Sequence, residues 1–487
     1  MRGLRIDSFA GGGGASIGME MAGYHPDIAI NHDEEAISMH RANHPNTRHY
    51  NSNIIKVDPL EVTDGQYVDL FWLSPDCTHH SKARGSKPKS KNIRGLAWVA
   101  IHWINKLKRR KPKLLVLENV EEFKDWGPLD KNGVPKPHLK GWFFKCFIGA
   151  LERRGYKVEY RELRACDYGS PTIRKRLFII ARSDGESIKW AEPTHAPADD
   201  ILVHNNILKP YRTTAECIDW SHPCPSIFNR KKPLAEKTMA RIAKGIDKFV
   251  LKAKKPYFIT EHANGSSNRN MDADEPMRTQ CASVKGGHFA LVQPFLSSYY
   301  GASIGGDVNE PCNTVTTKDR HSLLCAHIIS QYGQSVGRSA DDPIGTVTSG
   351  GMGKQGLVAS YISKMRGTNL GHSMEEPLHT ISAGGTHHAE VRALLKPKGV
   401  GNSMEIDGHV FEIHDIGMRM LQPRELFNAQ GFPGDYIIDY GLDRNGARVK
   451  LTKTAQVKMC GNSVCPPLAS AIIKANMKKS EVVEQLV

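Results

Sequence analysis

The sequence lacks the patterns of disulfide-stapled, zinc-bound and membrane-spanning proteins. Its ten cysteines are scattered over 487 residues and never form a CxxC pair, which argues against a zinc ribbon and against a secreted disulfide framework. His222 and Cys224 lie near Cys217, but a fourth ligand is missing, so we expect no metal there. The chain opens directly into a strand-like segment, without a signal peptide or a long apolar run. We therefore expect a protein of the reducing cytoplasm rather than of a membrane.

Acidic residues are in deficit. The 51 Asp and Glu are outnumbered by 66 Lys and Arg, which leaves a formal net charge of +15. This balance favours a polyanionic partner, and nucleic acid is the most common one because contacts from Lys and Arg to phosphate supply sequence-independent affinity. Many basic proteins bind no polyanion, so charge alone does not decide the matter. The length exceeds what one hydrophobic core usually supports, which predicts two domains.

Short apolar runs alternate with helical stretches in the first third of the chain. This pattern predicts an α/β fold with a doubly wound, mostly parallel sheet. A strand is expected at residues 4–9, followed by a glycine turn and a helix to about Ala22. Further buried strands are expected at 68–73, 113–118 and 176–181. Ligands of open α/β sheets bind at the carboxyl ends of the strands, so the motifs near these ends are candidate sites.

The amino-acid composition changes near residue 191, and four similar units follow. Each unit carries an acid–proline pair with threonine three residues after the proline, at 275–279, 310–314, 342–346 and 376–380. The prolines are 35, 32 and 34 residues apart, a period typical of one supersecondary unit stacked repeatedly. β-branched residues and glycine pairs favour β-hairpin units, and a helix is expected around 236–250. Whether the units are architecture or contact a ligand stays open.

A glycine-rich turn at residues 7–14 (DSFAGGGG) joins the first strand to the first helix. Glycines allow the backbone to approach a ligand closely, and a helix N-terminus offers unpaired N–H groups. The signal alone is weak, because many nucleotide-binding proteins and many tight turns share it.

A cysteine follows the strand at 68–73, in the segment 74–81 (SPDCTHHS). Cys77 precedes a loop rich in Lys and Arg, and nearby cations favour the reactive thiolate. The alternative is a loop cysteine among solvated lysines. His79 and His80 could act as base or ligands, but adjacent loop histidines more often face solvent.

Charged residues mark two further strand ends. Glu118 lies at the end of an apolar strand, where a partly desolvated carboxyl group can serve as an acid. Arg174 and Arg176 are one residue apart at the start of a strand and therefore share a face. They could bind a phosphate or a carbonyl oxygen, or simply form salt bridges.

Six blocks in this order resemble the DNA cytosine-5 methyltransferase family. They are residues 7–14, 74–81, 118–120 (ENV), 167–176 (DYGSPTIRKR), 422–433 (QPRELFNAQGFP) and 461–464 (GNSV). The resemblance covers about residues 1–185 and 415–487. It implies a catalytic domain formed by 1–190 and 455–487, a connector at 191–255, and a smaller β-rich target-recognition domain at 256–454. It also implies that the helix after Ser463 returns to pack beside the first motif.

The resemblance assigns roles to individual residues. Cys77 would be the nucleophile that adds to C6 of a cytosine turned out of the duplex, Glu118 would bind N3 and the exocyclic amine, and Arg176 with Arg174 would contact O2. S-adenosylmethionine is the implied cofactor, and its expected contacts are Asp7, Phe9, Gly11, Gly13, Asn31, Asn53, Asn462 and Ser463. Contacts with double-stranded DNA are expected from Ser81, Lys82, Arg84 and Arg94. No metal is implied.

The sequence departs from the family pattern at several positions. Asp76 stands where a proline usually precedes the cysteine, and this carboxylate needs solvent or a cation beside it. Asn31 and Asn53 replace acids that hold the cofactor ribose and adenine amine, and their amide oxygens can still accept hydrogen bonds. Thr172 replaces a glutamine. None of these changes removes a group that makes or breaks bonds.

Two rival functions are a tRNA cytosine methyltransferase on the same fold and a DNA-binding module with a decayed catalytic core. The long repeat-bearing insertion argues against the first, and the retained Cys77 and Glu118 argue against the second. We expect a monomer in the cytoplasm of a bacterial host or a phage-infected cell. The recognised DNA sequence, a cognate restriction endonuclease as partner and a modified methyl donor stay open.

Overall fold

The computed structural model describes residues 2–76, 79–80, 90–219, 221–222, 231–233 and 421–477, and between 258 and 420 it describes the strands. The chain divides into two compact units. Unit 1 comprises Met1–Pro210, Cys281–Ser283 and Phe427–Val487, and unit 2 comprises Tyr211–Gln280 and Val284–Leu426.

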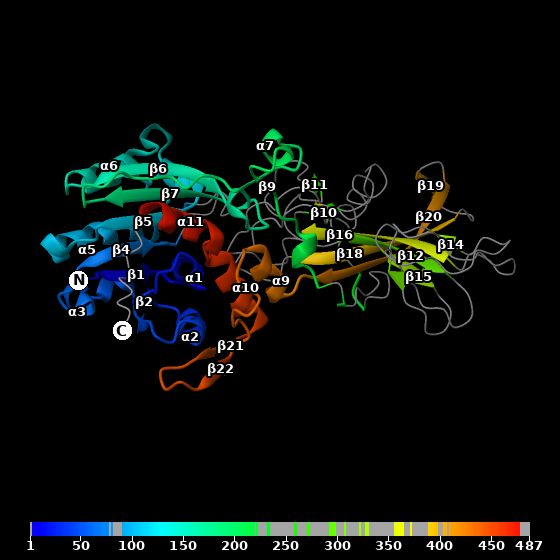
Figure 1. The fold of residues 1–487 in the computed structure, drawn as a ribbon, viewed down its shortest axis with the longest axis horizontal. Coiled ribbons are helices and arrows are strands. Elements are labelled where there is room, and N and C mark those ends of the chain that lie inside the picture. Colours follow the sequence, from blue (N-terminus) through cyan, green and yellow to red (C-terminus); the bar gives the residue numbers. More distant parts are fainter. Residues whose placement is uncertain are drawn as a thin grey trace, which may run out of the picture. The chain divides into compact units, whose positions relative to one another are not determined.

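Unit 1 is built on a seven-stranded sheet with the order β3-β2-β1-β4-β5-β7-β6 (Figure 1). The strands are β1 Leu4–Ser8, β2 Ile28–Asn31, β3 Arg48–Asn51, β4 Val68–Leu73, β5 Leu114–Asn119, β6 Lys157–Arg164 and β7 Lys175–Arg182. Strand β7 runs antiparallel to both of its neighbours, and the other pairings are parallel. The predicted doubly wound, mostly parallel sheet is confirmed, and the four predicted strands match within one residue at each end.

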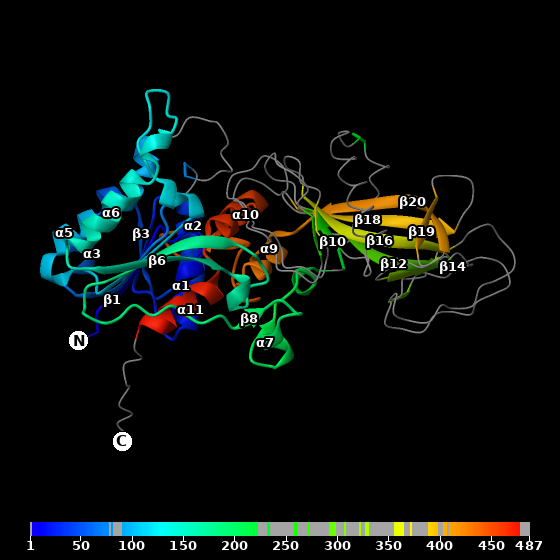
Figure 2. The same cartoon turned by 90° about the horizontal axis from the view of Figure 1, so that it is seen from above.

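Helices cover both faces of this sheet (Figure 2). Unit 1 contains α1 Gly14–Met21, α2 Glu34–Asn43, α3 Pro59–Thr63, α4 Lys91–Arg94, α5 Val99–Leu107, α6 Trp142–Glu152, α10 Lys453–Asn462 and α11 Pro466–Asn476. Helices α3, α5 and α6 share one core with the sheet, in which Phe71 stacks on Trp103 at 4.7 Å. Helices α1 and α11 share the core on the other face. Within the part of the chain that the structure describes, no helix is long and apolar enough to cross a bilayer.

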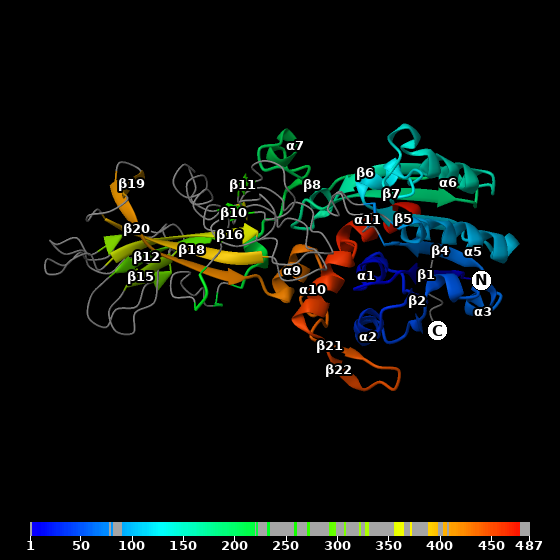
Figure 3. The same cartoon turned by 180° about the vertical axis from the view of Figure 1, so that it is seen from behind.

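The last helix of unit 1 packs against the first, as the resemblance implies (Figure 3). Glycines make this contact possible, because a Cβ on Gly18 would lie 2.6 Å from the Cβ of Ala469 and one on Gly14 would lie 2.1 Å from the Val464 carbonyl oxygen. The two ends of the chain are thereby locked together behind the glycine-rich turn.

A hairpin of β21 Tyr440–Leu442 and β22 Arg448–Lys450 packs on α2. Asn43 exchanges two hydrogen bonds of 2.8 Å with the backbone of Ile437, and Arg41 donates to the Leu442 carbonyl. These contacts place residues after 427 in unit 1. The domain limits expected at residues 190 and 455 separate a catalytic domain from the rest of the chain by function, not by compactness. This functional division stays a prediction.

Unit 2 contains an eleven-stranded, largely antiparallel sheet, which agrees with the predicted β-rich second domain. Its strands are β10 Phe258–Thr260, β11 Asn270–Asp272, β12 Val292–Ser298, β13 Gly306–Asp307, β14 His321–Ser322, β15 His327–Ser330, β16 Gln355–Lys364, β17 Gly371–His372, β18 His388–Pro397, β19 Ser403–Ile406 and β20 His409–Met420. Strands β12, β15, β16 and β18 each follow one acid–proline unit. The four units themselves and the helix expected at 236–250 lie outside the described residues.

A buried ion pair closes the end of unit 2. Helix α9 (Pro423–Ala429) begins there, and its Glu425 accepts two hydrogen bonds of 3.0 Å from Arg419. The same carboxylate accepts the backbone N–H groups of Asp219 and Gln422. The glutamate of the block 422–433 therefore joins the start of unit 2 to its end.

The remaining short elements lie in the connections. They are strands β8 His195–Ala196 and β9 Lys209–Pro210, helix α7 Ile201–His204, and 3-10 helices at Ile54–Lys56, Leu96–Trp98, Lys108–Arg110, Glu121–Asp125, Pro137–Leu139, Cys166–Tyr168 and Ala215–Cys217.

Candidate active site

The candidate site lies at one edge of the sheet in unit 1, where the strand order reverses. The turn after β1 and the loop after β4 leave neighbouring strands in opposite directions, which is where open α/β sheets bind ligands. Strand β7 is antiparallel, so its amino end, which follows the arginine motif, lies at the same edge as the carboxyl end of β5. All four motifs of the first domain therefore meet at one edge.

The turn after β1 has an unusual backbone. Phe9 has a φ of 65°, in the left-handed region that non-glycine residues rarely adopt, and its half-buried ring packs against the core. Gly11 and Gly13 have φ of 48° and 81°, which only glycine adopts without strain. Backbone strain of this kind persists only where the surrounding structure enforces it, which makes this turn a candidate functional site. A half-buried aromatic ring beside this glycine turn fits an adenine-bearing cofactor.

Asp7 lies behind this turn at the end of β1 and is buried. Burial raises the pKa of its carboxyl group to about 7, although hydrogen bonds from the Ser16 hydroxyl and backbone act in the opposite direction. Ser16 belongs to the first turn of α1, whose own N-cap, Gly13, has no side chain. Asp7 therefore caps α1 from the neighbouring strand and holds the glycine turn between them.

Two asparagines stand at the carboxyl ends of neighbouring strands. Asn31 ends β2, and its amide oxygen accepts the backbone N–H of Asp33 at 2.9 Å. Asn53 follows β3, and its amide oxygen accepts the N–H of Ile55 at 3.0 Å. Each oxygen keeps one lone pair and each amide keeps its N–H donors, so both side chains can bind polar groups of a cofactor.

Ser463 and Asn462 reach the glycine turn from the end of α10. The buried Ser463 hydroxyl donates to the Met459 carbonyl at 2.8 Å, and a Cβ on Gly12 would lie 2.6 Å from that hydroxyl oxygen. Asn462 is exposed. The structure thus gives Ser463 a packing role against the turn and leaves the Asn462 side chain accessible.

A charged cluster stands at the ends of β5 and β7. The Glu118 carboxylate lies 3.3 Å from Nε of Arg176 and 3.9 Å from a terminal nitrogen of Arg174. All three side chains are buried. Thr172, which replaces the usual glutamine, accepts the backbone N–H of Arg174 through its hydroxyl. The predicted acid and arginines are therefore brought together, and the arginines orient the carboxylate.

Asn119 links this cluster to the cysteine loop. Its amide donates to the Pro75 carbonyl at 3.2 Å, two residues before Cys77. Cys77 itself, together with Ser81, Lys82 and Arg84, lies outside the described residues. The sequence predicts that the Asp76 carboxylate needs either solvent or a cation beside it, and Asp76 is exposed to solvent. Sequence reasoning gave Asn119 no role, although its position next to Glu118 at a strand end was a usable signal.

We expected His79 and His80 to face solvent. This prediction is wrong, because both side chains are buried. His79 Nδ1 accepts the backbone N–H of Ser90 at 2.6 Å, and the His80 ring packs edge-on against Phe123 at 4.9 Å. Arg94 is also buried and donates to the Gly127 carbonyl at 3.0 Å. These three side chains anchor the two ends of the loop.

A second cysteine approaches the charged cluster. Cys465 is buried between α10 and α11, and its thiol donates to the Gln430 side chain at 2.8 Å. Burial raises its pKa to about 12, and the positive charges of Arg174 and Arg176 only partly oppose this. A thiol held in this form is a poor nucleophile. Cys465 is therefore a buried packing residue and not the reactive group of the site.

Taken together, these features define an α/β enzyme in which a cofactor turn and a glutamate–arginine cluster share one edge of the sheet. Residues 4–478 match the model of the C-5 cytosine-specific DNA methylase family, and the chain belongs to this family. It is a DNA cytosine-5 methyltransferase, as the six sequence blocks predicted. Methyl transfer in such enzymes depends on S-adenosylmethionine, and the ring of Phe9 and the amide groups of Asn31 and Asn53 fit that molecule.

The chain is similar to Type II methyltransferases and to a solved methyltransferase structure. The Type II methyltransferase M.AquIA of Picosynechococcus is 28% identical over 232 residues, 45% of this chain and 88% of that protein. The Type II methyltransferase M.DdeI of Desulfomicrobium norvegicum is 34% identical over 179 residues, 36% of this chain and 39% of that protein. The structure of the methyltransferase EhMeth of Entamoeba histolytica aligns with a TM-score of 0.46 and 13% identity over 98% of both chains.

Proposed function

We propose that the chain transfers a methyl group from S-adenosylmethionine to carbon 5 of a cytosine flipped out of a specific double-stranded DNA sequence. A covalent bond between Cys77 and C6 of the base is the central step. The observation that carries this proposal is the Glu118–Arg176–Arg174 cluster, which Asn119 ties to the segment that leads into Cys77. A base inside a duplex cannot reach such a site, so it must be extruded.

Each residue of the cluster has a defined task in this mechanism. The Cys77 thiolate adds to C6 while the Glu118 carboxyl group holds N3 and the exocyclic amine, so C5 becomes nucleophilic. Arg176, supported by Arg174, binds O2. After methylation a base removes the proton from C5 and the C6–S bond breaks, which restores both the ring and the thiolate. Covalent addition divides one difficult step into easier ones.

The methyl donor would be held by the turn after β1 and by the asparagines. Phe9 would pack on the adenine ring, Asn31 and Asn53 would bind the ribose and the adenine amine, and Asn462 would close the methionine end. Asp7, Gly11, Gly13 and Ser463 would shape the turn from behind. When bound, S-adenosylmethionine supplies an electrophilic methyl group on a sulfonium ion.

DNA would be held by the basic loop that contains Ser81, Lys82 and Arg84, with Arg94 at its base. We also propose that glycine-rich loops of some acid–proline units enter the major groove, where base edges can be distinguished. Deletion of one unit tests this, because unchanged sequence preference would favour a purely architectural role. The Type II methyltransferase relatives support a modification role, in which a cognate endonuclease would be the partner.

Bisulfite sequencing of DNA from cells that express the protein tests activity and target together. We expect protected cytosines at one recurrent sequence with the wild-type chain and none with Cys77→Ala. Protection of tRNA and not of DNA would instead support the RNA-directed alternative.

A further inference from the structure

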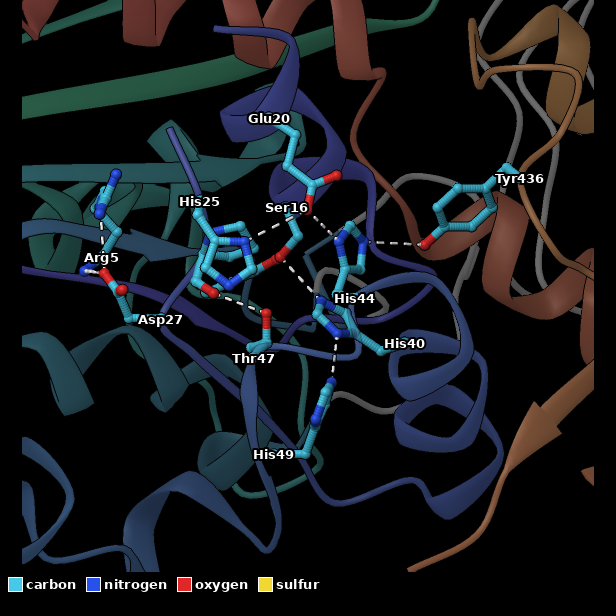
Figure 4. Close-up of polar contacts among 12 residues, drawn as sticks. Arg5, Ser16, Glu20, His25, Asp27, His40, His44, Thr47, His49 and Tyr436 are labelled. Atoms are coloured by element: carbon cyan, nitrogen blue, oxygen red, sulfur yellow. Dashed lines mark hydrogen bonds and ion pairs between the residues drawn. The ribbon is translucent and has the colours of Figure 1, made fainter. Parts of the chain in front are cut away.

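A row of four hydrogen-bonded side chains runs from the surface of unit 1 to the back of the glycine turn. We call Asp7, Ser16, His40 and His49 the histidine row. Ser16 Oγ lies 2.8 Å from the Asp7 carboxylate, His40 Nε2 lies 2.9 Å from Ser16 Oγ, and His49 Nε2 lies 2.8 Å from His40 Nδ1. Figure 4 shows the two histidines and Ser16 in line. The row joins β1, α1, α2 and β3, and its inner end, Asp7, lies directly before the glycine turn.

The inner three members of the row are buried, and the outer one is not. Asp7, Ser16 and His40 are at most 1% exposed. His49 is half-buried and lines a surface pocket together with Arg41 and Arg444. A proton can therefore enter the row only from the His49 end.

Both histidines are neutral at ordinary pH. Burial lowers the pKa of His40 well below its usual range, and burial together with the positive charge of Arg41 lowers that of His49 to about 4. A neutral imidazole has one N–H donor and one acceptor nitrogen. A row of two such rings and a hydroxyl group therefore has only two self-consistent directions.

In the first direction the row points inward. His49 Nε2–H donates to His40 Nδ1, His40 Nε2–H donates to Ser16, and the Ser16 hydroxyl donates to an ionised Asp7. In the second direction every bond is reversed, so a protonated Asp7 donates to Ser16, Ser16 donates to His40 Nε2, and His40 Nδ1–H donates to His49 Nε2. The second direction holds one more proton than the first. This proton binds to Nδ1 of His49, and each proton further along the row then moves to the next acceptor atom.

We propose that Ser16, His40 and His49 are positioning residues which carry a proton between the surface and Asp7, and thereby set how firmly the glycine turn is held for the methyl donor. This inference rests on the proposed function of that turn. An ionised Asp7 is the stronger cap for the N-terminus of α1, because negative charge is favoured there. Burial makes the ionised carboxylate the less stable form for the fold as a whole, but the hydrogen bonds from Ser16 favour it locally, so a protonated Asp7 holds the first turn of α1 less firmly.

Other titratable groups surround the row but do not belong to it. Glu20 on α1 pairs with His44 on α2 at 2.9 Å, and Tyr436 donates to the Gly12 carbonyl at 3.0 Å. Burial raises the pKa of Tyr436 well above its usual range, so it stays neutral. Arg41 faces His49 and is paired with Glu34. Because the pKa of Asp7 is about 7, the two directions interchange near neutral pH.

Nitrogen NMR of the cofactor-free protein, labelled at histidine, tests the row directly. Loss of signals in His40→Gln and His49→Gln assigns the two rings. We expect both to change from the Nε2–H tautomer to the Nδ1–H tautomer as the pH falls, with one shared midpoint near 7. Asp7→Asn and Ser16→Ala should abolish this midpoint, whereas the matched control His25→Gln, a histidine outside the row, should keep it.

Calorimetric titration with S-adenosylmethionine tests the coupling to the turn. If the ionised row is the binding form, the wild-type dissociation constant should be about tenfold larger at pH 6 than at pH 8, and that of Asp7→Asn should not vary with pH. If the histidine tautomers do not change with pH, or if they still change in Asp7→Asn, the proposed proton transfer along the row is wrong. Tautomers that change while the affinity stays constant would overturn its positioning role, and absence of binding at every pH would contradict the proposed function instead.

Discussion

Glu118 has two buried guanidinium groups within 4 Å, and this environment defines its part in catalysis. Glu118→Gln keeps the shape of the side chain and one acceptor oxygen for the arginines, but it removes the negative charge and the carboxyl proton. Because positioned proton transfer contributes about 10²–10⁴ in rate, kcat should fall within this range while the dissociation constant of S-adenosylmethionine stays unchanged. Single-turnover methylation measures the effect. Glu121→Gln, which removes a half-buried partner of Lys175, is the matched control and should retain activity.

Asn53 offers a second test at the scale of one residue. Its amide oxygen caps the N–H of Ile55, a task that aspartate performs equally well. Asn53→Asp keeps this cap and adds a charged oxygen for the adenine amine, and a charge-assisted hydrogen bond is about twice as strong as a neutral one. We expect S-adenosylmethionine to bind about three- to tenfold more tightly by calorimetry. Asn132→Asp adds the same charge in an exposed turn, and equal tightening there would contradict this account.

Single residues differed in how far the sequence could predict them. The places of Phe9 and Glu118 followed from strand ends, because apolar runs locate the carboxyl edge of a sheet. The bond between His40 and Ser16 joins side chains 24 residues apart on two helices, and no local pattern encodes it. The burial of His79 and His80 was missed because their partners, Ser90 and Phe123, come from later segments of the chain.

At the scale of the element, α1 depends on close contact with the segment before α11. A Cβ on Gly14 would meet the Val464 carbonyl oxygen at 2.1 Å, and neither backbone can yield easily. Gly14→Ala should therefore lower the free energy of unfolding by about 1–3 kcal/mol in denaturant titrations. Gly434→Ala, where nothing lies within 4 Å, is the control, and equal loss in both variants would exclude this contact as the cause.

Apolar runs in the sequence predicted where the strands lie. They did not predict whether each strand runs parallel or antiparallel to its neighbours. The run at 176–181 reads like its parallel neighbours, yet β7 is antiparallel, because the short turn after β6 leaves no room for a crossover helix. This reversal brings Arg174 and Arg176 to the edge that bears Glu118. The sequence alone allows Arg174 and Arg176 to bind a phosphate or a carbonyl oxygen or to form salt bridges, and the direction of β7 places them beside Glu118.

At the scale of the whole molecule, the buried carboxyl group of Asp7 makes stability depend on pH. Its pKa is raised from 3.8 to about 7, so the fold favours the protonated form. The resulting stability is fully present below about pH 4 and is lost as the pH rises through 7. Between pH 5 and pH 8 the wild-type chain should therefore lose about 3 kcal/mol relative to Asp7→Asn. Urea titrations at both pH values check this, and a constant difference would contradict it.

The covalent bond between Cys77 and C6 of cytosine is the central claim. Duplex DNA in which 5-fluorocytosine replaces the target cytosine tests it most directly, because fluorine at C5 prevents the final elimination. With S-adenosylmethionine present, we predict a protein–DNA complex that survives denaturation, with the mass of the adduct on the peptide that contains Cys77. Cys77→Ala should form no such complex. An adduct on another cysteine, such as Cys465, or a stable complex in the Cys77→Ala variant would contradict the account.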